Sequence, residues 1–404
     1  MITHDPQKAI NQLNIILSNP GKKIGFLFGA GISLEDKERV DLIPGVSDII
    51  LADGKLSKKG LTSIILDFFT QEPQKTALKQ IIDDLDGSKN NIESILSSIS
   101  EKEKAAGREK LCGLDKDELK KLREEIENKI KDIVSVHKDK KFGSRKLYHY
   151  DLARWIKNAD RHSEVEIFTT NYDYLLESSL EKYQVPYFDG FIGSRQAFFY
   201  PEWIEDDSGI KKWTKLWKLH GSLGWAVDEE NKEIVRNPDD DSKNNAGMIY
   251  PSFLKYDRSR KQPYLSYMDR LSFFLRQEDA VLIICGYSFG DQHINDLLIS
   301  SLSQSRSAHA FILKFGNLVE DNFISQEIAK KVSKISLYAK DSAVIGCQYG
   351  IWELSSKSEN VFGVKIIESG SAKKVEFLLG DFGILTSFLS ESMNGNNNLS
   401  QEHA

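Results

Sequence analysis

The chain has 404 residues, of which 40% are hydrophobic and 28% are charged, with a formal net charge of -6 at pH 7. This is the composition of a soluble globular protein of two or three domains, or of one large domain with insertions. The acidic balance gives no overall basic field of the kind that indicates nucleic-acid binding, so we expect no direct nucleic-acid contact.

Three cysteines, Cys112, Cys285 and Cys347, lie far apart in the sequence. Their odd number and wide spacing argue against a disulfide scaffold and fit a reducing compartment. The first residues lack the charged start and apolar run of a signal peptide, and no apolar run reaches the length of a transmembrane helix. We therefore expect a cytoplasmic protein without a membrane segment.

The first elements predict the beginning of a nucleotide-binding sheet. Residues 6–18 place apolar side chains at helical spacing, and residues 24–28 form a short apolar run of buried-strand length. Gly29-Ala30-Gly31-Ile32-Ser33 follows this strand at once, and a strand that enters a glycine turn is typical of such sheets. Two glycines after a strand can also simply form a tight turn, so both interpretations stay open for this motif alone.

Residues 55–150 have a different character and predict a module of four or five helices. Apolar residues recur at intervals of three and four in the segments 61–69, 81–85, 92–99 and 119–133. The sequence does not reveal the module's function, and a packing or oligomerisation layer is the simplest interpretation. The basic stretch 138–146 fits a solvated loop or a phosphate-binding patch, and we favour the loop.

Strand patterns then return and alternate with helical ones. The segments 165–169, 213–219, 280–285 and 310–315 are predicted strands. The alternation predicts an α/β fold, a Rossmann-like doubly wound parallel sheet with a large helical insertion and a small C-terminal element. We place the sheet domain in residues 1–54 and 151–315 and the helical insertion in residues 55–150. The small C-terminal element covers residues 316–404. Within it we expect strands near 361–367 and 375–379 and a disordered tail over 394–398. Residues 226–262 are polar and predict a long insertion or lid.

Three more polar motifs follow the later strands. Asn171 and Asp173 come after the second strand, His220 after the third, and the loop with Gly286, Ser288 and Asp291 after the fourth. Ligands bind at this edge of parallel sheets. Each motif also has a simpler interpretation, because Asn171 can cap a helix, His220 can be a buried structural residue and Asp291 is expected to cap the following helix.

In this order, the motifs GAGIS (29–33), TTNYD (169–173), KLHGS (218–222) and GYSFGD (286–291) resemble the sirtuin-like superfamily. They look most like the bacterial sirtuin-like proteins of antiphage defence, including the type associated with HerA ATPases. The resemblance covers about residues 20–315, with the helical module as an insertion. The set is specific only in combination.

The resemblance implies that the site binds NAD as its substrate and needs no metal. Asn171 would hold the nicotinamide ribose and position the attacking nucleophile, and His220 would act as base toward a ribose hydroxyl. Asp173 would support that site. The resemblance further assigns the phosphates to Gly29, Ala30, Gly31 and Ser33, and the adenosine side to Gly286 and Ser288.

Two departures from the protein-deacylating sirtuins change the expected reaction. The chain has no C-x-x-C motif with which to hold their structural zinc. Residues 40–46, Val-Asp-Leu-Ile-Pro-Gly-Val, also replace the usual Gly-Ile-Pro-Asp-Phe-Arg. We therefore expect hydrolysis of NAD by water, with protein deacylation as the less favoured alternative.

The leading hypothesis is an NAD glycohydrolase that depletes NAD in bacterial antiphage defence under control of oligomeric assembly. The resemblance implies a homo-oligomer with a partner protein, for which a HerA-type hexameric ATPase is favoured over an Argonaute-type protein. The alternative is a non-catalytic NAD or ADP-ribose sensor that regulates a partner.

Overall fold

The computed structural model describes residues 2–46, 48–50, 56–85, 92–107, 109–194, 197–228, 233–236, 262–318, 324–355, 361–369 and 372–401. Its centre is a ten-stranded sheet. Seven neighbouring strands are parallel, in the spatial order β14 (Ile335–Tyr338), β13 (His309–Leu313), β12 (Ala280–Cys285), β2 (Lys23–Phe28), β5 (Glu166–Thr169), β9 (Thr214–Lys218) and β6 (Tyr187–Phe188). The mostly parallel α/β fold predicted from the sequence is confirmed.

The sheet continues beyond its parallel part. β15 (Ser342–Ile345) and β16 (Gln348–Trp352) extend it in antiparallel fashion, and the short β1 (Thr3–His4) pairs with β16. The sequence interpretation ended the sheet domain at residue 315, but these strands carry it to residue 352. Only the hairpin of β17 (Val364–Ser369) and β18 (Ala372–Phe377) matches the predicted small C-terminal strands.

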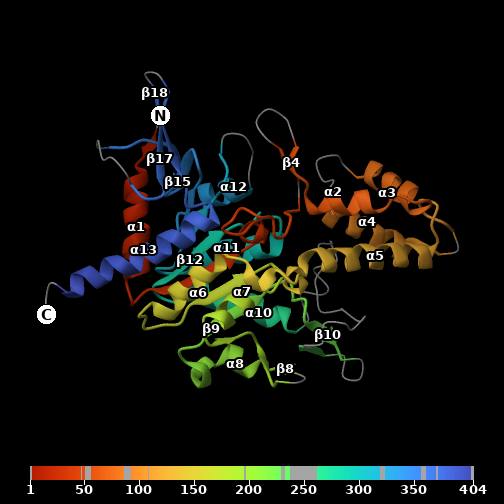
Figure 1. The fold of residues 1–404 in the computed structure, drawn as a ribbon, viewed down its shortest axis with the longest axis horizontal. Coiled ribbons are helices and arrows are strands. Elements are labelled where there is room, and N and C mark those ends of the chain that lie inside the picture. Colours follow the sequence, from red (N-terminus) through yellow and green to blue (C-terminus); the bar gives the residue numbers. More distant parts are fainter. Residues whose placement is uncertain are drawn as a thin grey trace.

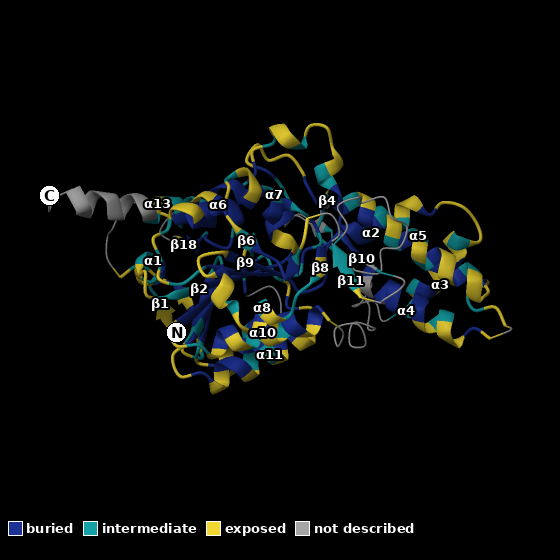
Figure 2. Ribbon diagram, turned by 90° about the horizontal axis from the view of Figure 1, so that it is seen from below, coloured by how far each residue is buried: buried dark blue, intermediate teal, exposed yellow. Residues whose placement is uncertain are grey.

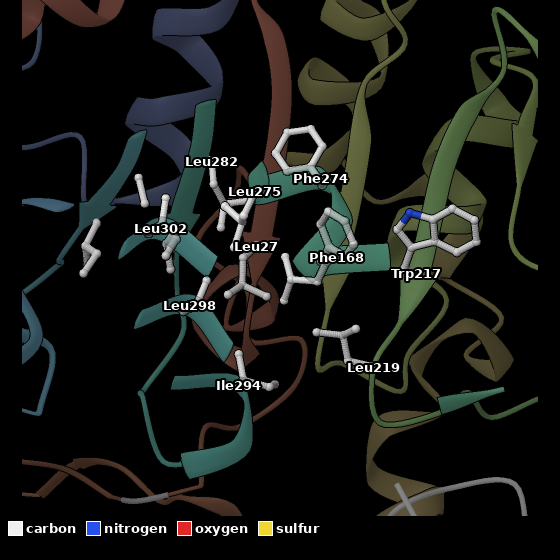
Figure 3. Close-up of a cluster of buried hydrophobic side chains, with 14 of the residues drawn as sticks. Leu27, Phe168, Trp217, Leu219, Phe274, Leu275, Leu282, Ile294, Leu298 and Leu302 are labelled. Carbon is white, nitrogen blue, oxygen red and sulfur yellow. The ribbon is translucent and has the colours of Figure 1, made fainter. Parts of the chain in front are cut away.

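Helices cover both faces of the sheet, and the strand side chains alternate between them. Leu27, Phe168 and Trp217 pack on one face against α10 (Tyr264–Arg276), α11 (Gln292–Gln304) and α12 (Ile324–Lys331). Figure 3 shows this core, with Leu298 and Leu302 of α11 beside Leu27. Phe26 and Phe28 point to the other face, which is covered by α1 (Pro6–Ser18), α6 (His149–Asn158), α7 (Leu175–Lys182) and α13 (Phe382–Gln401). Two buried faces explain why the strands are continuously apolar.

The predicted helical module is present and lies to one side of the sheet (Figure 1). It consists of α2 (Leu61–Phe68), α3 (Gln74–Asp83), α4 (Ile92–Ala105) and α5 (Lys116–Val134). These helices share one apolar core, and that core also includes Leu42, Ile43, Leu175 and Leu223 of the sheet domain. Figure 2 shows buried segments both in the sheet and in the helices of the module. The module is therefore packed against the segments that follow β2, β5 and β9.

Smaller elements lie beside the sheet. β7 (Phe191–Ile192), β8 (Ala197–Phe199), β10 (Trp225–Val227) and β11 (Ile234–Arg236) form a second antiparallel sheet, near the short α8 (Glu202–Glu205). β3 (Ile49–Ile50) and β4 (Leu56–Lys58) pair before the module. The expected insertion 226–262 contributes β11, while residues 229–232 and 237–261 lie outside the described part. The expected disordered tail, 394–398, falls within the bounds of α13 where side chains are not described.

A buried histidine makes the packing of α6 on α13 sensitive to acid. His149 is 1% exposed, neither ring nitrogen has a hydrogen-bond partner, and its ring lies 5.0 Å from that of Phe382. Burial lowers the pKa of His149 to about 3, because the charged ring would lose its hydration. Burial likewise lowers the pKa of His309, which contacts Ser336, to about 4.

We predict that His149→Phe reduces the acid sensitivity of folding. Below about pH 6.5 the unfolded histidine binds a proton and the folded one does not, so the unfolding free energy falls as the pH falls from about 6.5 toward 3. Each such histidine adds up to about 1.4 kcal/mol per pH unit to that slope. Thermal unfolding at pH 7 and pH 5 should show a smaller loss of Tm in the variant than in wild type. Replacement of the exposed His162 by Ala should keep the wild-type slope, and an unchanged slope in His149→Phe would refute the assignment.

Candidate functional site

The four polar motifs meet at the carboxyl edge of the sheet because their strands are neighbours. β2 lies between β12 and β5, and β9 follows β5. The loops that leave these strands therefore stand in the order 286–291, 29–33, 170–174 and 219–222. Backbone hydrogen bonds join them, from Thr170 N–H to Phe28 O (3.1 Å), from Leu219 N–H to Thr169 O (2.8 Å) and from Leu223 N–H to Tyr172 O (3.1 Å).

Three glycines allow two of these loops to touch through their backbones. Gly31 N–H donates to Gly286 O (3.0 Å), and Gly29 N–H donates to Cys285 O (3.3 Å). A Cβ on Gly31 would lie 2.6 Å from Gly286 Cα, and a Cβ on Gly29 would lie 2.6 Å from Gly286 O. Gly286 itself has φ +69, which disfavours other residues. Loop-to-loop packing therefore requires all three glycines, whatever ligand they contact.

This contact reduces the number of backbone N–H groups in the glycine turn that remain for the expected binding of phosphates. The amide of Gly31 is engaged by Gly286, and the amide of Ile32 donates to Gly29 O (3.2 Å). Ala30 and Gly31 are nevertheless exposed at the tip of the turn. The turn therefore offers an open backbone surface that a phosphate can approach, and two of its N–H groups already serve the fold.

Asn171 does not cap a helix. Its Nδ2 donates to Gly29 O (3.1 Å) and to Ser33 Oγ (3.1 Å), and Ser33 Oγ in turn donates to Asp173 Oδ2 (3.1 Å). Because Gly29 O can only accept, the amide nitrogen must face it, which fixes the orientation of Asn171. Its Oδ1 accepts no hydrogen bond from the part of the chain that the structure describes. Ser33, expected to line the phosphates, is 1% exposed and joins these two loops.

A buried ion pair lies beneath this network. Lys218 Nζ donates to Asp173 O and pairs with Glu177 Oε1 at 2.8 Å. Burial raises the pKa of Glu177, and the neighbouring ammonium of Lys218 opposes that shift. Lys218 is 2% exposed at the end of β9, so it links the loop of Asp173 to the strand that carries His220. Lys218 belongs to the KLHGS motif, but its pairing with Glu177 depends on a residue 41 positions earlier, which the local sequence does not indicate.

His220 has a carboxylate partner, Asp291, which the sequence predicted only as the cap of the following helix. Its Nε2 lies 3.0 Å from Asp291 Oδ2. Asp291 also caps α11, as predicted, because its Oδ1 accepts from the backbone N–H groups of His293 (2.9 Å) and Ile294 (3.3 Å). A residue seventy-one positions away cannot be matched to His220 by local spacing, so no sequence signal identified the pair.

The loop 286–291 is held in an unusual conformation. Phe289 is 3% exposed and has φ +61, which is uncommon for a bulky residue. Asn295 of α11 stabilises it, with Nδ2 donating to Phe289 O (2.8 Å) and Oδ1 accepting from the Tyr287 hydroxyl (3.3 Å). Ser288 is exposed at the tip of this loop, as a residue that contacts a ligand there would have to be.

Ion pairs hold residues 35–39, which lie between Ser33 and the altered segment 40–46. Successive residues pair with four other parts of the chain: Glu35 with Lys58 (3.1 Å), Asp36 with Arg145 (3.2 Å), Lys37 with Asp151 (2.5 Å), Glu38 with Lys146 (3.0 Å) and Arg39 with Asp381 (3.8 Å). We call these contacts the 35–39 clasp. It joins the glycine turn to β4, to the basic stretch, to α6 and to the start of α13. Arg145 and Lys146 thus have carboxylate partners within the protein.

A comparison with known protein families agrees with this geometry. Residues 165–335 match the family model of the SIR2-like domain. This part of the chain is therefore similar to SIR2-like domains, a family that uses NAD, and the match supports the resemblance to the sirtuin-like superfamily. It begins at the start of β5, so the glycine turn after β2 joins the SIR2-like domain through the sheet rather than through contiguous sequence.

No curated protein matches the chain. Within the described residues, no three His, Cys, Asp or Glu side chains are grouped so that they could hold a metal ion. Among the helices in that same part, none is both long and apolar enough to cross a membrane.

We predict that Gly31→Ala disrupts the SIR2-like site by separating the loops. The new Cβ would meet backbone rather than a flexible side chain, so the unfolding free energy should fall by about 1–3 kcal/mol. Gly143→Ala is the matched control, because nothing lies within 4 Å of its added Cβ. Thermal unfolding should show a lower Tm for Gly31→Ala alone, and equal Tm values would contradict the close approach.

We predict that the 35–39 clasp depends on the pair of Arg145 with the buried Asp36. Asp36 has a side chain that is 2% exposed, so Arg145→Ala leaves a buried carboxylate without its cation, and the unfolding free energy should fall by about 1–3 kcal/mol. Lys146→Ala breaks a pair whose side chains are 69% and 57% exposed, so its effect should stay below about 1 kcal/mol. Denaturant unfolding of both variants measures the difference, and equal losses would show that Asp36 does not need Arg145.

Proposed function

We propose that the chain is an NAD glycohydrolase that cleaves NAD to nicotinamide and ADP-ribose. The observation that carries the proposal is the pair of polar groups in the SIR2-like domain, an oriented Asn171 and a carboxylate-bound His220, at the sheet edge that holds the glycine turns. Water is the acceptor: its oxygen forms a bond to the ribose C1′, the C1′–N bond breaks, and the electron pair leaves with neutral nicotinamide. The water proton passes to a base or to solvent.

The orientation of Asn171 suits a water-positioning role. Its nitrogen is bound to Gly29 O and Ser33 Oγ, so its carbonyl oxygen points away from them and can accept from a water molecule or a ribose hydroxyl. Ser33 and Asp173 brace the amide from the opposite side. A side chain held in this way loses little entropy when substrate and water bind.

His220 suits a proton-accepting role toward a ribose hydroxyl. Its side chain is 10% exposed and contacts a carboxylate that is itself held at a helix N-terminus. A developing positive charge on the sugar in the transition state is stabilised by such fixed polar groups, because they need not reorganise during the reaction. The separate contacts of Asn171 and His220 support two distinct roles.

Water is the proposed acceptor of the ADP-ribosyl group because residues 40–46, after Ser33, differ from the corresponding segment of the protein deacylases. The 35–39 clasp fixes the residues just before this altered segment, 40–46, by ion pairs on several sides. The sequence also lacks the paired cysteines of the zinc module that accompanies deacylation. Both features favour a small acceptor over an acyl-lysine side chain.

We further propose that the activity serves bacterial antiphage defence and is controlled by assembly of a homo-oligomer with a partner protein. A HerA-type hexameric ATPase is the first candidate and an Argonaute-type protein the second, both from the family resemblance. An enzyme that consumes NAD must be silent at rest. The core shared by the helical module and Leu175 and Leu223 provides a physical route by which contacts on the module can move the site loops.

The test is the fate of NAD with the purified chain, alone and with a candidate partner, followed by chromatography. Wild type should release nicotinamide and ADP-ribose in equal amounts, and Asn171→Ala and His220→Ala should each lower the rate by at least about 100-fold. Asn11→Ala and His162→Ala, at exposed positions, are the matched controls. NAD binding without products in any assembly state would favour the sensor. Nicotinamide release that requires an acyl-lysine peptide would favour deacylation.

A further inference from the structure

The carboxylate of Asp291 serves two groups at once. Its Oδ1 accepts from two backbone N–H groups at the start of α11, and its Oδ2 lies 3.0 Å from His220 Nε2. The Asp291 side chain is 6% exposed, so little water competes for either oxygen. The N-terminus of a thirteen-residue helix also favours a negative charge at this position. Asp291 is therefore a rigid acceptor beside the ring.

A rigid acceptor decides which ring nitrogen carries hydrogen. A carboxylate offers only lone pairs, so Nε2 of His220 must present a hydrogen to Oδ2. In the neutral ring the lone pair is then on Nδ1. When Nδ1 accepts a proton, the ring becomes a cation beside a fixed carboxylate, which stabilises it. The arrangement prepares one nitrogen, and only one, to act as base.

We propose that Asp291 is the positioning residue of this site and holds His220 in the tautomer whose Nδ1 accepts the proton. This inference rests on the proposed function for its kinetic consequences but not for its chemistry, since the tautomer exists whether or not NAD is cleaved. It also gives the GYSFGD loop a role beyond adenosine contact. Through the cap of α11, Asp291 ties the tautomer of His220 to the loop after β12.

Asp291→Asn is the informative variant because it keeps the size and one acceptor oxygen. The amide oxygen can still cap α11, while the amide nitrogen faces Nε2 as a donor. A donor requires a lone pair on Nε2, so the hydrogen should move to Nδ1 and remove the base. We expect kcat to fall by about 100-fold or more, with little change in KM because the role proposed for Asp291 is to orient His220 and not to bind substrate.

Asp115→Asn is the matched control. Asp115 caps α5, where its Oδ1 accepts from Glu118 N–H at 2.9 Å, and within the described residues its hydrogen-bond partners include no histidine. It makes the same chemical change at a helix N-cap remote from the site. We expect its kcat to equal that of wild type, even if its Tm falls as an altered cap requires.

The tautomer is measured directly by two-bond ¹⁵N–¹H correlation NMR of protein labelled at its eight histidines, with His220→Phe to identify the signal. Wild type should show hydrogen on Nε2, and Asp291→Asn should show it on Nδ1. Hydrogen on Nδ1 in wild type, or an unchanged tautomer in Asp291→Asn, would overturn the proposal. An Nε2 tautomer in a protein that never cleaves NAD would support the positioning role and reject the glycohydrolase instead.

Discussion

The contact on which the site depends is the approach of two backbones, that of the glycine turn after β2 and that of Gly286 after β12. Gly31 and Gly286 touch where no Cβ fits, and their hydrogen bond joins the two loops. This contact fixes the position of the glycine turn at the carboxyl edge of the sheet. The carbonyl of Gly29 is thereby placed where Asn171 can donate to it, so the orientation of the candidate catalytic amide follows from the packing of glycines.

Polar groups at the edge are satisfied by one another across strands. Asn171, Ser33 and Asp173 form one chain of hydrogen bonds, and Lys218 with Glu177 supports it from below. Buried polar groups are costly unless they are paired. Each loop therefore restrains its neighbour, and a ligand meets side chains that are already oriented. His220 belongs to the same pattern, because its partner Asp291 is itself held by the backbone of α11.

The helical module is joined to this edge by both apolar and ionic contacts. Its core contains Leu175 and Leu223, each within a few residues of Asp173 and His220. The 35–39 clasp adds ion pairs between the segment after the glycine turn and both flanks of the module, with Lys58 before its first helix and Arg145 after its last. The apolar core does not depend on salt, whereas the exposed pairs of the clasp are weak and screened. Packing therefore couples the module to the site loops more strongly than surface charge does.

The sequence alone determined the α/β class, the five parallel strands β2, β5, β9, β12 and β13, the helical module and the four motifs, because local apolar periodicity and strand-end motifs encode them. It did not reveal α6, α10 or the strands β14 to β16, because the apolar pattern of a short segment does not distinguish a helix from a strand. Only the tertiary structure decided that Ser33 joins loops and that Asn171 faces Gly29. It alone also paired His220 with Asp291. These contacts join residues of different strands, and their formation depends on strand order, which local sequence does not record.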